Sequence, residues 1–92
     1  MRAVSQAVVD YLGFGRASFP QDERSALDQL QSGERKTFDA IMAFADRLEP
    51  NWDELNLLSS GNWARDQLKA EFPALENNAL DALAWACTFG WK

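Results

Sequence analysis

The chain has 92 residues, of which 47% are hydrophobic and 12% aromatic, and this composition indicates one folded domain and not a disordered segment. Its net charge is −5 at pH 7, and the acidic excess lies after residue 36, so a nucleic-acid partner, which needs a basic surface, is not expected. With no histidine and a single cysteine, Cys87, the chain cannot form an internal disulfide or the usual Cys and His zinc sites.

The N-terminal segment, residues 1–15, contains an apolar stretch that Ser5, Gln6 and Asp10 interrupt, unlike the apolar core of a signal peptide. No stretch approaches the roughly 18 apolar residues of a membrane-spanning helix. We therefore expect a soluble, cytoplasmic protein that folds as a single domain over residues 1–92 and does not bind a membrane.

Residues 2–12 are predicted to form a helix, because apolar side chains recur there at helical spacing. These apolar residues are Val4, Ala7, Val8, Tyr11 and Leu12. Gly13 and Gly15 follow and are expected to end the helix in a turn. Strands are not expected, since valine and isoleucine together occupy only four positions of the chain.

A second helix is predicted over about residues 20–31. Ser18 and Gln21 have the spacing of a capping box, and Pro20 suits the first turn of a helix. Few apolar residues recur along this segment, so we expect the helix to lie on the surface of the bundle.

The clearest helical pattern covers about residues 34–49, and Pro50 is expected to end it. Its apolar side falls within one half of a helical wheel and should form the centre of the core. The residues on this side are Phe38, Ile41, Met42, Phe44, Ala45 and Leu48.

A short fourth helix is predicted to begin at Asn51, which has the N-x-x-E spacing of a helix start with Glu54. Its apolar stripe holds Trp52, Leu55 and Leu58, whereas Leu57 points away from that stripe. The sequence SSGN at 59–62 is expected to break this helix.

Two further helices complete the prediction. Asn62 can cap a fifth helix that runs to Phe72, and Pro73 is expected to open the last helix, over about residues 73–89. The fold predicted from these segments is an irregular all-α bundle of five or six short helices that cross at ridge-and-groove angles.

No catalytic, metal or cofactor signature occurs. The sequence GFGRAS at 13–18 has two glycines of a phosphate loop, but it follows a predicted helix where the dinucleotide fingerprint needs a strand. Cys87 lies on the apolar arc of the last helix, where burial makes a thiol unreactive. We therefore expect neither an enzyme nor a bound cofactor or metal.

The C-terminal helix carries a concentration of aromatic residues. Its apolar arc holds mainly alanine and leucine, whereas Trp85 falls on the opposite arc with Asn77 and Asp81. Gly90 is expected to take the left-handed conformation that ends a helix, so that Trp91 folds back on the last turn near Trp85.

Two interpretations of these aromatic residues remain open. In the first they belong to the fold, and Trp91 partly covers Trp85. In the second they form an exposed anchor with a polar rim, as protein interfaces do, and Trp63 joins them because it lies off the apolar stripe of its own helix. The candidate partner-binding residues are Trp85, Phe89, Trp91, Asp81, Asn77 and Trp63.

These observations favour a small protein-binding module: an inhibitor, an immunity-type protein or an adaptor that docks on a larger protein through an acidic, aromatic helical face. A partner with a basic surface would suit the net charge. The alternative is a small-ligand binder or an enzyme with a pocket lined by Trp and Phe between short helices. Self-association is also compatible with the sequence.

Overall fold

The computed structural model describes residues 1–91 and is entirely helical, with no β-strand among those residues. It contains four α-helices and one short 3₁₀ helix, η1: α1 (Arg2–Leu12), η1 (Arg24–Leu27), α2 (Ser32–Arg47), α3 (Leu57–Glu71) and α4 (Asn77–Trp91). The predicted all-α class is therefore confirmed, while the predicted number of five or six helices is slightly too high.

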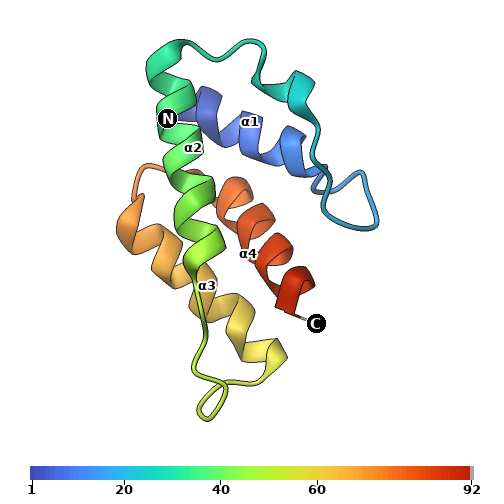
Figure 1. The fold of residues 1–92 in the computed structure, drawn as a ribbon, viewed down its shortest axis with the longest axis vertical. Coiled ribbons are helices and arrows are strands. Elements are labelled where there is room, and N and C mark those ends of the chain that lie inside the picture. The colour runs from blue at the N-terminus through green and yellow to red at the C-terminus, as the bar shows by residue number, and fades with distance from the viewer. Residues whose placement is uncertain (92) are drawn as a thin grey trace.

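The helices α1, α4 and α3 lie side by side in a layer, and α2 crosses this layer (Figure 1). α4 lies between α1 and α3 and packs against both, and α2 contacts all three. α4 contacts each of the other three helices, and its side chains Ala79, Leu80, Ala82 and Leu83 are at most 1% exposed. The core thus centres on α4, with Ile41 of α2 packed into it, rather than on the helix predicted over 34–49.

The first helix ends where it was predicted to end. Gly13 has a φ of 72°, in the left-handed region that favours glycine, and its N–H donates to the carbonyl oxygens of Val9 and Asp10. Gly15 also has a positive φ, so both glycines serve the turn.

The prediction of a helix over residues 20–31 is wrong, because only the single 3₁₀ turn of η1 forms there. The backbone N–H groups of Gln21 and Glu23 donate to the carbonyl oxygens of Leu12 and Tyr11, each at 2.9 Å. These carbonyls lie at the C-terminal end of α1, where a helix has no internal partner for them. The segment runs along the end of α1 because its donors are used there, and no capping box forms at Ser18.

The short helix predicted from Asn51 does not form, because residues 51–56 are not helical, and α3 runs from Leu57 through the break predicted at 59–62. Asn51 instead closes a turn, in which its carbonyl accepts from the N–H groups of Glu54 and Leu55. The cap is Asn56: its side chain accepts from the Ser59 N–H at 2.8 Å, and the Ser59 hydroxyl accepts from the Asn56 N–H at 3.0 Å. Ser59 therefore supports the helix that it was predicted to break.

The last helix begins at Asn77 instead of Pro73, and it does not end at Gly90. Just before its start, the Glu76 N–H donates to the hydroxyl of Ser5, which is fully buried on α1. Gly90 is helical and has no positive φ, so α4 continues to Trp91. The predicted left-handed stop and the fold-back of Trp91 are therefore wrong.

Candidate functional site

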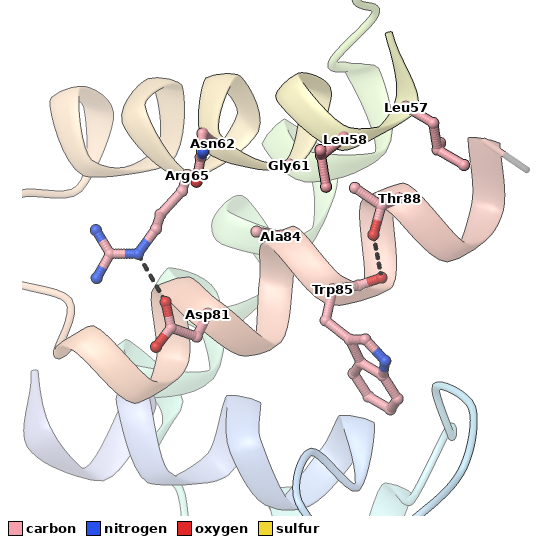
Figure 2. Close-up of a pocket in the computed structure, with 9 residues that line it drawn as sticks. All are labelled: Leu57, Leu58, Gly61, Asn62, Arg65, Asp81, Ala84, Trp85 and Thr88. Atoms are coloured by element: carbon pink, nitrogen blue, oxygen red, sulfur yellow. Dashed lines mark hydrogen bonds and ion pairs between the residues drawn. The ribbon is translucent and has the colours of Figure 1, made fainter.

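An open groove lies between α3 and α4, with a volume of about 560 Å³ (Figure 2). It is lined by Leu57, Leu58, Gly61, Asn62 and Arg65 of α3 and by Asp81, Ala84, Trp85 and Thr88 of α4. None of these residues comes from α2, which crosses the helix layer elsewhere. The groove is a surface of the α3 and α4 pair that no other described helix covers.

Small residues bring the two helices together beneath the groove. Ser60 and Ala64 of α3 are completely buried against the neighbouring helices, and Ala84 of α4 is nearly so. A Cβ placed on Gly61 would lie only 3.2 Å from the Cγ2 atom of Thr88. Because the helices approach so closely, the groove is shallow and its floor consists of small side chains.

An ion pair closes one end of the groove. The Nε–H of Arg65 donates to Oδ1 of Asp81 at 2.7 Å, and its Nη2 donates to Oδ1 of Asn77 at 3.1 Å. Asp81 and Asn77 were predicted to rim a partner-binding surface. In the structure both engage Arg65, so the charge of Asp81 is largely neutralised by a neighbour in its own chain.

Two leucines form the other end of the groove. Leu57 is 40% exposed and Leu58 is 88% exposed, the most exposed of the large hydrophobic residues in residues 1–91. The sequence pattern placed Leu58 on an apolar stripe with Trp52 and Leu55, which is wrong because the helix starts at Leu57 and not at Asn51. Asn56 and Ser59 have the spacing of a helix cap, and a helix start predicted there would have given the correct faces of α3.

The C-terminal aromatic residues lie in two clusters, and not in the single anchor of the second interpretation. The Trp85 ring packs on Phe14 at a centroid distance of 5.5 Å and on Phe89 at 6.4 Å. Figure 2 shows the indole of Trp85 pointing away from α3, and the side chain is half-buried. Trp85 thus lines the groove while its ring packs on the turn after α1.

Trp91 belongs to a second aromatic cluster on a different side of α4. Its ring lies 5.9 Å from that of Trp52 and 6.4 Å from that of Trp63, so the structure does bring Trp63 and Trp91 together. Positions 89 and 91 point in nearly opposite directions on a helix, because two residues correspond to about 200° of rotation. The prediction of one cluster depended on the helix ending at Gly90.

Cys87 is only partly accessible and sits against the core. Its Sγ–H donates to the carbonyl oxygen of Ala45 at 3.8 Å. Burial raises the pKa of the thiol to about 11 from its ordinary value of 9.0, and the negative charge of Asp46 adds to the rise. The thiolate needed for nucleophilic chemistry is therefore disfavoured at neutral pH.

Residues 1–91 contain no group of three or more Asp, Glu, Cys or His side chains that could hold a metal ion. None of their helices combines the length and the apolar character required to cross a membrane. Comparisons with known protein families, with curated proteins and with solved structures find no match to this chain.

Proposed function

We propose that the protein is a small protein-binding module that docks on a larger protein through the groove between α3 and α4. The observation that carries the proposal is the exposure of Leu58, at 88%, beside the partly exposed Leu57. A single exposed leucine is ordinary on a protein surface. Here two adjacent leucines continue into an apolar groove with a polar rim, and such surfaces typically mark protein interfaces.

The residues around the leucines suit this use. Asn62, Arg65 and Asp81 supply polar groups at the rim, while Gly61 and Ala84 leave the floor free of bulky side chains. Trp85 also lines the groove, and the packing of its ring on Phe14 fixes this side chain before any partner binds.

The overall charge supports a partner with a basic surface. The chain carries a net charge of −5, which raises the rate of encounter with a positively charged protein. The groove is also open to solvent along its length, whereas sites for small ligands usually enclose most of the ligand surface. We therefore favour a protein partner over a small molecule.

The proposal is tested by capture from a native extract with three forms of the protein. Wild type and Phe19→Glu are expected to recover the same specific partner, because Phe19 is 56% exposed but does not line the groove. Leu58→Glu places a charge at the end of the groove and is expected to lose that partner while keeping its helical circular dichroism. Equal recovery of the partner by Leu58→Glu would reject the groove as the docking surface.

A further inference from the structure

We infer that a pocket at the C-terminal end of α2 binds the quaternary ammonium group of a ligand, between two indole rings and beside two carboxylates. The pocket has a volume of about 570 Å³ and is lined by residues 46–50, Trp52 and Trp91. None of these residues lines the groove between α3 and α4. The inference therefore concerns a second surface and does not depend on the proposed docking function.

The two indole rings of the pocket are nearly perpendicular. The ring centroids of Trp52 and Trp91 lie 5.9 Å apart, and the ring planes differ by 85°. Because both residues line the pocket, the two rings form an aromatic corner in it. Trp63 packs on Trp91 at 6.4 Å without lining the pocket, and this contact supports the second ring. An aromatic face attracts a cation that lies within about 6 Å of the ring centroid.

The charges around the pocket favour a cation. Asp46 and Glu49 line it, are exposed, and form no ion pair with another described residue. Arg47 also lines it, so two carboxylates and one guanidinium leave one net negative charge on the lining side chains. α2 ends at Arg47, and the C-terminus of a helix adds about half a negative charge. Charge complementarity therefore points to a positively charged ligand.

The combination of rings and carboxylates suits a methylated nitrogen. A primary ammonium is a compact, strongly hydrated charge, and an aromatic corner replaces little of the water that it would lose. Methyl groups surround the charge with apolar surface that packs on the rings. Recognition of quaternary ammonium groups by aromatic rings is the established use of this attraction. The carboxylates attract the charge without having to donate or accept a hydrogen bond.

Choline tests the inference, with 3,3-dimethylbutan-1-ol as an uncharged control of the same shape. The indole N–H resonances of the four tryptophans are followed by NMR, with sodium chloride as the control for ionic strength. Choline is expected to shift the resonances of Trp52 and Trp91 but not that of Trp85, and to bind at least roughly fivefold more tightly than the alcohol. Equal binding of the two compounds, or no shift beyond that caused by sodium chloride, would overturn the inference.

Substitutions of Trp52 test the aromatic corner. Trp52→Leu should weaken choline binding at least roughly fivefold, and Trp52→Phe, which keeps a ring, should weaken it less. Trp52 is 48% exposed, so both variants should keep the helical circular dichroism of the wild type. Leu58→Glu, which changes the groove between α3 and α4, should bind choline like the wild type. Unchanged binding by a folded Trp52→Leu would contradict the inference.

Substitutions of the charged residues test the sign of the ligand charge. Asp46→Asn with Glu49→Gln should weaken choline binding roughly two- to fivefold, whereas Arg47→Gln should strengthen it. The matched control, Asp28→Asn with Glu71→Gln, removes the same charge from other exposed positions and should bind choline like the wild type. Equal weakening by both double variants, or weaker binding by Arg47→Gln, would contradict a cation site at this pocket.

A quaternary ammonium group can come from a small molecule or from a trimethylated lysine of a protein. A short glycine- and serine-flanked peptide with one trimethyllysine separates these sources. Tighter binding of this peptide than of choline would indicate a protein ligand, and binding no tighter than that of choline would indicate a small molecule. The same peptide with unmodified lysine or with arginine should bind more weakly than the trimethylated form. Equal or tighter binding of either would overturn the assignment of a methylated nitrogen.

Discussion

Arg65 on α3 and Asp81 on α4 connect the two walls of the groove through a hydrogen-bonded ion pair of 2.7 Å. Asn77, one turn before Asp81, accepts a second hydrogen bond from the same guanidinium at 3.1 Å. The guanidinium therefore holds the first turns of α4 against the middle of α3. Asp81 contributes to the packing of this helix pair, in addition to any contact that it makes with a partner.

We predict a measurable but modest coupling between these two residues. The pair is partly exposed, so Arg65→Met and Asp81→Asn should show a coupling of about 0.2–1 kcal/mol in a double-mutant cycle. The measurement is urea unfolding of the wild type, the two single variants and the double variant, followed by circular dichroism. Strictly additive effects would contradict the role assigned to the pair.

Gly61 is expected to be necessary for the close packing of α3 on α4. Substitution by leucine should destabilise the fold by about 1–3 kcal/mol, because the side chain has no room beside Thr88 and must push the helices apart. Gly33, which is also helical but has open space around its Cβ position, is the matched control. Gly33→Leu should be neutral or stabilising, since leucine favours helix over glycine.

A second pair of variants separates crowding from helix propensity at Gly61. Alanine favours a helix over glycine by about 1 kcal/mol, but its methyl group would lie 3.2 Å from Thr88 Cγ2. In a Thr88→Ala background that contact disappears, and Gly61→Ala should then stabilise more than it does in the wild type. An identical effect in both backgrounds, measured by urea unfolding, would show that Thr88 does not limit the space.

Cys87 should make stability depend on alkaline pH. The pKa of its thiol is higher in the folded chain, at about 11, than the value of 9.0 expected in the unfolded chain. The unfolded chain therefore loses this proton first as pH rises. The contribution is fully present below about pH 9 and is lost as pH approaches 11, so the free energy of unfolding should fall over that interval.

The test compares the wild type with Cys87→Ala across this pH interval, so that titration of lysine and tyrosine is common to both. The wild type should lose more stability than the variant between pH 9 and 11. Labelling by a thiol reagent at neutral pH should also be slow in the native protein and fast after unfolding. Rapid labelling of the native protein would contradict the disfavoured thiolate.

The sequence predicted helices well where local signals agreed. Residues 2–12 have helical periodicity followed by Gly13, and the observed α1 matches this range. The pattern over 34–49 likewise identifies α2, which lies two residues earlier at each end. The start of α3 was predicted wrongly. Asn51, Asn56 and Asn62 can each cap a helix, and capping propensity alone does not identify the one that does. The reciprocal hydrogen bonds of Asn56 and Ser59 make that choice.

Long-range hydrogen bonds account for other errors. The N–H groups of Gln21 and Glu23 pair with the end of α1, and the Glu76 N–H pairs with Ser5, which lies 71 positions away in the chain. No local pattern contains such partners.

The candidate site was predicted only in part. The aromatic residues of α4 were correctly singled out, since Trp85 and Asp81 do line the groove, but Leu58 was placed on an apolar stripe with Trp52 and Leu55. That error followed from the helix start alone, because shifting the start of a helix changes which residues share a face. The separation of Trp85 from Trp91 has the same kind of cause, the unexpected extension of α4 to residue 91.

The most direct test of the docking surface is the Kd of the captured partner for Leu58→Ala. Leu58 is 88% exposed, so the substitution should change the free energy of unfolding by no more than about 0.5 kcal/mol. Binding should weaken by about 1 kcal/mol or more, roughly fivefold in Kd, as truncation of an apolar side chain that is buried by the partner does. Phe19→Ala, which also truncates an exposed hydrophobic side chain, should leave Kd unchanged. An unchanged Kd for Leu58→Ala in a stably folded protein would contradict the assignment of the groove between α3 and α4 as the docking surface.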